Sequence, residues 1–108
     1  MTKLDDVISA PAGGFSFPPL HPGRTLAAEL AARDMTAHTL ALKLRVPANR
    51  ISAIVAGNRG ITAETALRLG RHFGNGAAFW MNLQARYDLA IAQRDLGERI
   101  EAEVEVAA

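Results

Sequence analysis

A short helical pattern flanked by arginines occupies residues 45–62, which read RVPANRISAIVAGNRGIT. At about 100° per residue, Ile51, Ile54 and Val55 fall on one side of a helix, where they can pack on a core. The opposite side and its flanks carry small or uncharged residues and one arginine: Ala48, Asn49, Arg50, Ser52, Ala53 and Ala56. A solvated helix would normally carry Glu and Lys there. This face therefore predicts a binding surface.

The surroundings of this helix are free of carboxylates. No Asp or Glu occurs between Asp34 and Glu64, and the interval contains Lys43, Arg45, Arg50 and Arg59. Residues 21–75 hold eight basic residues against three acids, for a charge of +5, whereas residues 1–20 carry −1 and residues 76–108 carry −3. Such segregation indicates a central region that faces a polyanion, and chance clustering on a solvated surface is the alternative.

The whole chain of 108 residues fits one domain, and it contains no cysteine. Disulfides and thiolate zinc sites are therefore excluded, which fits a reducing cytoplasm. The N-terminus lacks the apolar stretch of a secretory signal, and no run approaches the roughly 20 apolar residues of a membrane span. We expect a soluble cytoplasmic protein with no role in a membrane.

Apolar residues at helical spacing, together with start and stop residues, predict five helices at about 21–33, 36–44, 47–57, 62–73 and 77–96. Thr36 and Thr62 are suitable N-caps, and Pro22 and Pro47 suit a first helical turn. The positions expected to be buried are Leu26, Leu30, Leu40, Ala41, Leu44, Ala66, Leu69, Phe73, Phe79 and Leu83. The fold class is all-α.

The two ends of the chain differ from this helical centre. Residues 1–20 contain the Pro- and Gly-rich stretch SAPAGGFSFPPL and predict a mobile arm. Residues 21–97 form the predicted helical domain. In residues 98–108, apolar residues alternate with Glu101, Glu103 and Glu105, which favours a short strand over a continued helix.

Two short helices joined by a tight turn, the second small-faced and basic, are typical of a helix-turn-helix. Asn and Arg suit its outer face, because Asn can bond adenine bidentately and Arg can do the same to guanine. Asn58, Arg59 and the next helix start could bind phosphate. The plainer interpretation makes Gly57 and Gly60 turn residues and Arg59 an ordinary surface arginine.

Catalysis has little support in the sequence. His21, His38 and His72 do not form a pair at i, i+4 spacing, so no helix presents two metal ligands. There is no GxxxxGK phosphate loop, and Ser52 has no His and Asp partners at motif spacing. We expect no enzyme activity, no bound metal and no cofactor.

Four stretches resemble the HigA family of antitoxins, in the VapI-like branch of the Xre/Cro-type helix-turn-helix group. They are HPG at 21–23, RVPANRISAIVAGNRGIT at 45–62, ETALRL at 64–69 and FWMNLQARYDL at 79–89. The resemblance covers residues 21 to 96, and the last stretch is its most specific part. One departure is Arg45, because the family usually has Gly in this turn, so the turn must adopt a different or a strained backbone conformation.

The resemblance implies a five-helix, lambda-repressor-like domain that binds double-stranded DNA at a palindromic operator as a homodimer and represses its own operon. It also implies neutralisation of a RelE-like ribonuclease toxin. The expected base-contacting residues are Ala48, Asn49, Arg50, Ser52 and Ala53. The expected phosphate-contacting residues are Thr36, Asn58 and Arg59 by resemblance, and Lys43 and Arg45 by charge.

The last long helix has more apolar positions than one core face needs. Trp80, Leu89 and Ile91 are therefore candidates for a subunit interface, with burial of Trp80 in the core as the equal alternative. Two other functions stay open. One is a stand-alone dimeric Xre-type repressor without a toxin, and the other is a protein-interaction module whose helix-turn-helix is silent.

Overall fold

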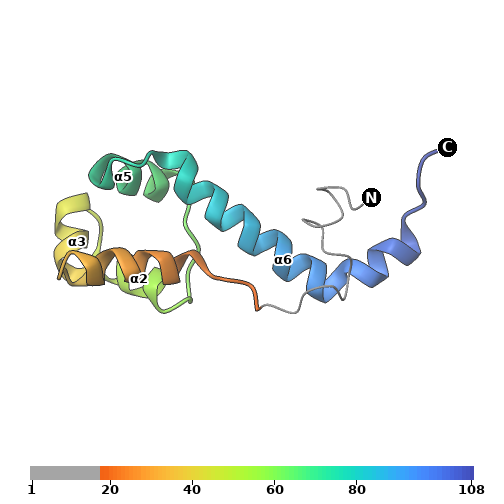
Figure 1. Cartoon of the computed structure of the whole chain (residues 1–108), viewed down its shortest axis with the longest axis horizontal. Helices are drawn as coiled ribbons and strands as arrows, with labels where there is room; N and C mark the ends of the chain where they lie inside the picture. Colours follow the sequence, from red (N-terminus) through yellow and green to blue (C-terminus); the bar gives the residue numbers. More distant parts are fainter. Residues whose placement is uncertain (1–17) are drawn as a thin grey trace, which may run out of the picture.

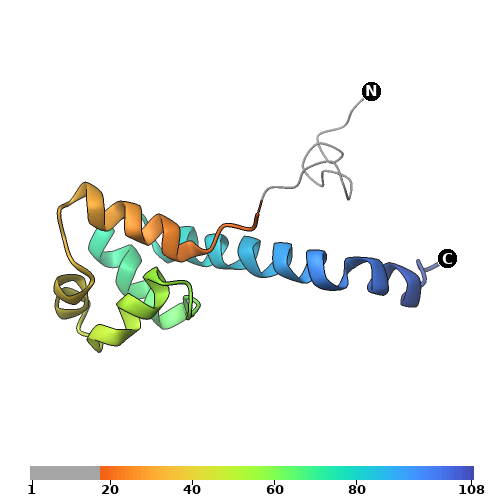
Figure 2. The same ribbon diagram turned by 90° about the horizontal axis from the view of Figure 1, so that it is seen from below.

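The computed structural model describes residues 18–108, and this part of the chain is all-helical, as predicted. Most of the predicted N-terminal arm lies outside the described residues. The five helices are α2 (Pro22–Ala32), α3 (Ala37–Leu44), α4 (Ala48–Val55), α5 (Ala63–Phe73) and α6 (Ala77–Glu103). The first four and the start of α6 form a compact body, from which the rest of α6 projects (Figures 1 and 2).

The helix starts lie where the sequence predicts them. The hydroxyl oxygens of Thr36 and Thr62 accept hydrogen bonds from the backbone N–H groups of Thr39 and Thr65 and so cap α3 and α5. Pro47 precedes α4, where its missing N–H leaves no bond unmade. These caps satisfy N–H groups that a helix cannot satisfy internally.

The core is built from one face of each helix and from the loop after α4. Its buried members are Leu26, Leu30, Leu40, Ala41, Leu44, Ile51, Ile54, Ile61, Ala66, Leu69 and Trp80. All the predicted core positions of α2, α3 and α5 are among them except Phe73, which is partly buried against the same cluster. The small body therefore has one continuous core.

The start of α2 packs directly on the end of α4. Gly23 is buried, and a Cβ atom there would collide with the backbone carbonyl of Ile54. His21 caps α2, since its Nδ1 accepts a hydrogen bond from the Gly23 N–H at 2.9 Å. The His21 ring also lies edge-on to Tyr87 of α6, with 4.8 Å between ring centroids. The HPG stretch thus joins three helices.

Of the two expectations for Trp80, burial in the core is confirmed, and the placement of Phe79 in the core is wrong. Trp80 is 0% exposed and belongs to the core, whereas Phe79, which was expected there, is 41% exposed. Trp80 therefore offers no surface to a second subunit, and its indole N–H donates to Asn75 Oδ1 at 2.9 Å. Leu83, which was also expected in the core, is partly buried against it, and the next buried residue of α6 after Trp80 is the polar Gln84.

Gln84 fastens the loop after α4 to α6. Its Oε1 accepts a hydrogen bond from the buried Ile61 N–H at 2.7 Å, and its Nε2 donates to Asp88 Oδ1 at 2.9 Å. The family-like stretch at 79–89 therefore includes residues with a structural role.

The C-terminal tail is helical as far as Glu103, so the strand predicted for residues 98–108 is wrong. α6 has 27 residues, and it runs unbroken past residue 97, where the sequence analysis divided domain from tail. A strand needs a neighbour for its backbone bonds, whereas a helix satisfies them internally, as the Val104 N–H does by donating to the Ile100 carbonyl. Because this end is exposed, no buried face imposes a helical spacing on its apolar residues.

The Gly23 contact predicts that Gly23→Ala destabilises the protein by roughly 1–3 kcal/mol, because backbone must move to admit the methyl group. Gly97→Ala is the matched control, since an added Cβ there would meet only the movable end of Gln93. The control should gain about 0.5–1 kcal/mol, as expected for Ala in place of a helical Gly. Urea unfolding measures both, and equal stabilities for the two variants would contradict the proposed close contact.

Candidate nucleic-acid interface

α3 and α4 are joined by a three-residue turn that contains a left-handed residue. Arg45 ends α3 with φ 62° and ψ 47°. The Val46 N–H still reaches the Ala41 carbonyl at 3.0 Å, and Val46 packs against the core. The turn therefore has the left-handed conformation that Gly adopts easily. Arg45 adopts it under strain, because its Cβ crowds the backbone there. This is the strained conformation that the sequence suggested.

α4 is held by its inner side and open on its outer side. Ile51 and Ile54 are both 0% exposed, and Val55 is partly buried against the core. Asn49 and Ser52 are exposed, as the sequence predicted. The Ser52 hydroxyl lies within 3.4 Å of the Ala48 and Asn49 carbonyls, so it folds back on its own helix and leaves the surface slim.

Six residues line one open hollow on this outer side: Asn49, Ser52, Ala53, Ala56, Asn58 and Arg59. The structure thus brings together three of the expected base-contacting residues and two of the expected phosphate-contacting residues. The loop turns beside them through Gly57, whose φ is 82°, and the Asn58 N–H donates to the Ala53 carbonyl at 2.9 Å. Ala48 is exposed at the start of α4 and does not line the hollow.

The other expected phosphate-contacting residues lie on α3. Thr36 is exposed at its start, and Lys43 and Arg45 are exposed at its end. Within residues 18–108, neither these two cations nor Arg59 forms an ion pair with a carboxylate. Among the described residues, these three positive charges therefore have no carboxylate partner.

Arg50 is positioned differently from its neighbours on α4. Its side chain is 22% exposed, and its Nη1 lies 3.3 Å from Oε1 of Glu64 at the start of α5. It does not line the hollow. The structure therefore places this expected base-contacting residue on the flank of α4, in contact with an acid.

Glu64 also binds Arg68, a residue that the sequence analysis did not single out. Arg68 Nε donates to Glu64 Oε2 at 3.1 Å, and Arg68 Nη1 donates to the Leu44 carbonyl at 2.8 Å. The hydrogen bond from Arg68 and the charges of Arg50 and Arg68 hold the pKa of the Glu64 carboxyl below its ordinary value. The spacing of Glu64 and Arg68, i and i+4 on one helix, was the available signal.

The remaining candidates for subunit contact, Leu89 and Ile91, lie on different sides of α6. Leu89 is 71% exposed, while Ile91 is partly buried. Residues two apart on a helix point about 200° apart, so these two cannot share a flat interface. Leu89 is on the outer side of α6, away from Trp80.

In residues 18–108, no helix is both long and apolar enough to cross a membrane. The same residues contain no group of three His, Cys, Asp or Glu side chains close enough to hold a metal ion.

Known proteins share this architecture. Virulence-associated protein I of Dichelobacter nodosus is 48% identical over 89 residues, which are 82% of each chain. An addiction-module antidote protein of the HigA family from Coxiella burnetii has 48% identity and a TM-score of 0.83, over 84% of this chain and all of that one. The chain belongs to the HigA family of antitoxins. No family model matches it.

A further HigA relative was solved with DNA. The Pseudomonas aeruginosa antitoxin HigA, solved with the higBA promoter, has 45% identity and a TM-score of 0.81, over 83% of this chain and 99% of that one. The family resemblance drawn from the sequence is thus confirmed. These HigA relatives are named as an antidote protein and an antitoxin, not as enzymes. This agrees with the expectation that the chain has no enzyme activity.

The left-handed turn predicts that Arg45→Gly raises the free energy of unfolding. The strain removed is roughly 1–2 kcal/mol, and the added flexibility of Gly costs about 0.5–1 kcal/mol, so the net gain lies between about 0 and 1.5 kcal/mol. Arg59→Gly removes the same charge at a position where φ is not positive, and it should not stabilise. Thermal unfolding compares the two, and a loss of stability in Arg45→Gly would contradict the prediction.

Proposed function

We propose that this HigA-family protein is a sequence-specific DNA-binding antitoxin that represses its own operon as a dimer and neutralises a RelE-like ribonuclease toxin. The observation that carries the DNA-binding part is the outer side of α4. Asn49 and Ser52 face outward there, beside Asn58 and Arg59, in one hollow free of carboxylates.

The shape of this side suits the major groove. A groove about 12 Å wide admits a helix, and small side chains let the backbone of that helix approach the bases. Ala48, Ala53 and Ala56 add little bulk, and Asn49 supplies a donor and an acceptor for a base edge. Arg59, Lys43 and Arg45 can neutralise phosphates on both sides of the groove. The related Pseudomonas antitoxin solved with promoter DNA supports the same use of the fold.

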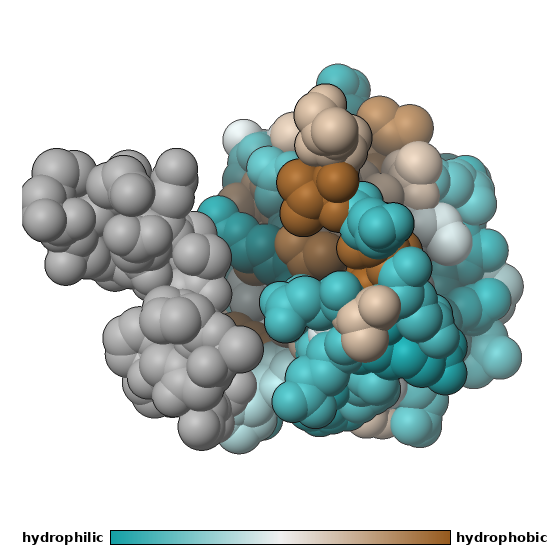
Figure 3. All heavy atoms as spheres, turned by 90° about the vertical axis from the view of Figure 1, so that its right-hand side faces the viewer, coloured by the Kyte–Doolittle hydropathy of each residue, from teal (hydrophilic) through white to brown (hydrophobic). Residues whose placement is uncertain are grey.

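A dimer is supported by the outer side of α6. Leu89, Leu96 and Ile100 recur at intervals of seven and four residues, share the side opposite Trp80, and are 71%, 37% and 47% exposed. From the C-terminal end of the molecule, apolar side chains interrupt an otherwise hydrophilic surface (Figure 3). A dimer would offer two α4 helices to two half-sites, which lie about 34 Å apart along a duplex, and so multiply their discrimination.

Base-contacting and phosphate-contacting roles predict different effects on DNA binding. Asn49→Ala should weaken operator binding by about 1–3 kcal/mol, or roughly 5- to 150-fold, and leave binding to unrelated duplex unchanged. Arg59→Ala should weaken binding to both duplexes and make the log–log salt dependence shallower by about 2 for a dimer. Fluorescence anisotropy on labelled duplexes at several salt concentrations measures each effect.

The wild-type salt dependence is the control for this experiment. Its log–log slope should be about −4 or steeper for a dimer. A slope near zero, or an operator affinity unchanged in Asn49→Ala and Arg59→Ala, would contradict DNA binding through α4. The protein-interaction module with a silent helix-turn-helix would then be the better account.

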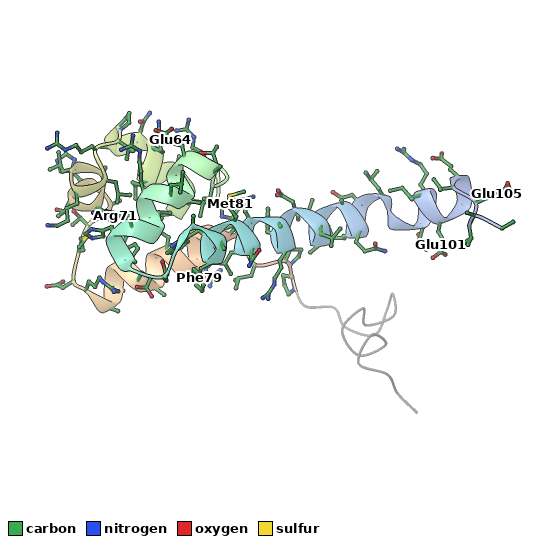
Figure 4. The ribbon with its side chains drawn as sticks, turned by 90° about the horizontal axis from the view of Figure 1, so that it is seen from above. Glu64, Arg71, Phe79, Met81, Glu101 and Glu105 are labelled. Carbon is green, nitrogen blue, oxygen red and sulfur yellow. The ribbon has the colours of Figure 1, made fainter. Side chains whose placement is uncertain are left out.

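The toxin part of the proposal rests on family membership and on charge. Residues 76–108 hold six acids against three basic residues, and Glu101 and Glu105 lie at the far end of α6 (Figure 4). An acidic surface suits a basic ribonuclease.

We therefore expect a RelE-like protein encoded next to this gene to co-purify with the chain and to lose ribonuclease activity in the complex. Size-exclusion chromatography and an RNA-cleavage assay test this, with an unrelated basic protein of similar size as the control. Failure to form a complex, with operator binding intact, would favour the stand-alone repressor.

A further inference from the structure

One acid stands beside the candidate DNA-binding side. Glu64 is the sole carboxylate between Asp34 and Asp88, and its side chain is 58% exposed at the start of α5. A negative charge near phosphates opposes DNA binding, so its presence needs an explanation. A role limited to stabilising the first turn of α5 would account for the charge but not for its two arginine partners.

The two carboxylate oxygens of Glu64 bind different arginines. Oε1 lies 3.3 Å from Arg50 Nη1, and Oε2 lies 3.0 Å from Arg68 Nη2. Arg68 is itself fixed, because its Nη1 donates to the carbonyl of Leu44, the last residue of α3. Arg68 therefore fixes the position of the Glu64 carboxylate, and the carboxylate in turn holds Arg50.

The consequence falls on Arg50, which is the one charged residue of α4. An unrestrained arginine can reach phosphate oxygens on any sequence, so it raises affinity for all DNA alike. Arg50 must break its ion pair with Glu64 before its guanidinium can contact DNA. A single phosphate oxygen offsets this loss poorly, whereas the two acceptors of a guanine offer a bidentate replacement.

We propose that Glu64 is a positioning residue for sequence specificity, which acts by restraining Arg50 and so suppresses binding to non-cognate DNA. This inference rests on the proposed DNA-binding function. In this role Glu64 competes with DNA for Arg50 and makes no contact with DNA itself, since discrimination requires that the wrong partner be penalised as well as the right one bound.

The test compares Glu64→Gln with the wild type on operator and non-cognate duplexes. Released Arg50 adds one phosphate contact per subunit, so the log–log salt slope on non-cognate DNA should steepen by about 2 for a dimer. Affinity for non-cognate DNA should rise more than affinity for the operator, so the ratio of the two falls. The position is exposed, and circular dichroism verifies that the variant is folded.

Glu29→Gln is the matched control. Glu29 is also an acid bound to an arginine four residues away, Arg33, but it lies on α2, and among the described residues its carboxylate forms no ion pair with Arg50. Glu29→Gln removes one negative charge, as Glu64→Gln does, but leaves the ion pair of Arg50 intact. Comparing the two variants therefore distinguishes the release of Arg50 from a change in net charge. The operator to non-cognate ratio and the salt slope of Glu29→Gln should stay close to those of the wild type.

A double-mutant cycle with Arg50→Gln completes the test. If Glu64 acts through Arg50, then Glu64→Gln has no effect on specificity in the Arg50→Gln background. The inference is overturned if the ratio and slope of Glu64→Gln match those of the wild type, if Glu29→Gln produces the same change, or if the change persists without Arg50. If the wild type itself shows no preference for operator DNA, the proposed function fails first and the inference falls with it.

Discussion

The close contact between the start of α2 and the end of α4 is the constraint on which the binding surface depends. α4 is only eight residues long, too short to be stable alone in water, and it exposes one whole side. It is held by two buried isoleucines and by the approach of Gly23 to the Ile54 carbonyl. Because His21 caps α2 and packs on Tyr87, the same contact ties the orientation of α4 to α6.

Electrostatics and sterics act together on the outer side of α4. The lack of carboxylates removes repulsion from phosphates, and the alanines remove the bulk that would keep a helix out of a groove. The exception, Glu64, lies between two arginines and is neutralised by them. In the proposed function, Lys43, Arg45 and Arg59 would meet phosphates of any sequence, whereas Arg50 is held by Glu64. General attraction to DNA and recognition of a sequence would then rest on different residues.

Much of this arrangement could be predicted from the sequence, because it is encoded locally. Thr36 and Thr62 cap helices through bonds to residues three positions away, and the buried leucines recur at helical spacing. The errors arose where the decisive partner is distant or absent. Gln84 is buried because it bonds Ile61, 23 residues away, whereas Phe79, which was expected in the core, is exposed. The tail alternates like a strand, but residues 18–108 contain no strand with which it could pair. The pairing of Arg50 with Glu64 crosses 14 residues, so no local pattern reveals it.

Because α6 is one unbroken helix, a displacement of its C-terminal end can be transmitted to the helical body at its start. The 27 residues of α6 span about 40 Å, and the helix runs past the buried indole of Trp80 near its start to an exposed end at Glu103. A partner that binds the C-terminal end of α6 would exert a force on the whole helix. Gln84 of this helix holds the Ile61 backbone, which follows the loop of Asn58 and Arg59. A tilt of α6 at Gln84 would move the Ile61 backbone beside Asn58 and Arg59, together with the buried Trp80 on the same helix.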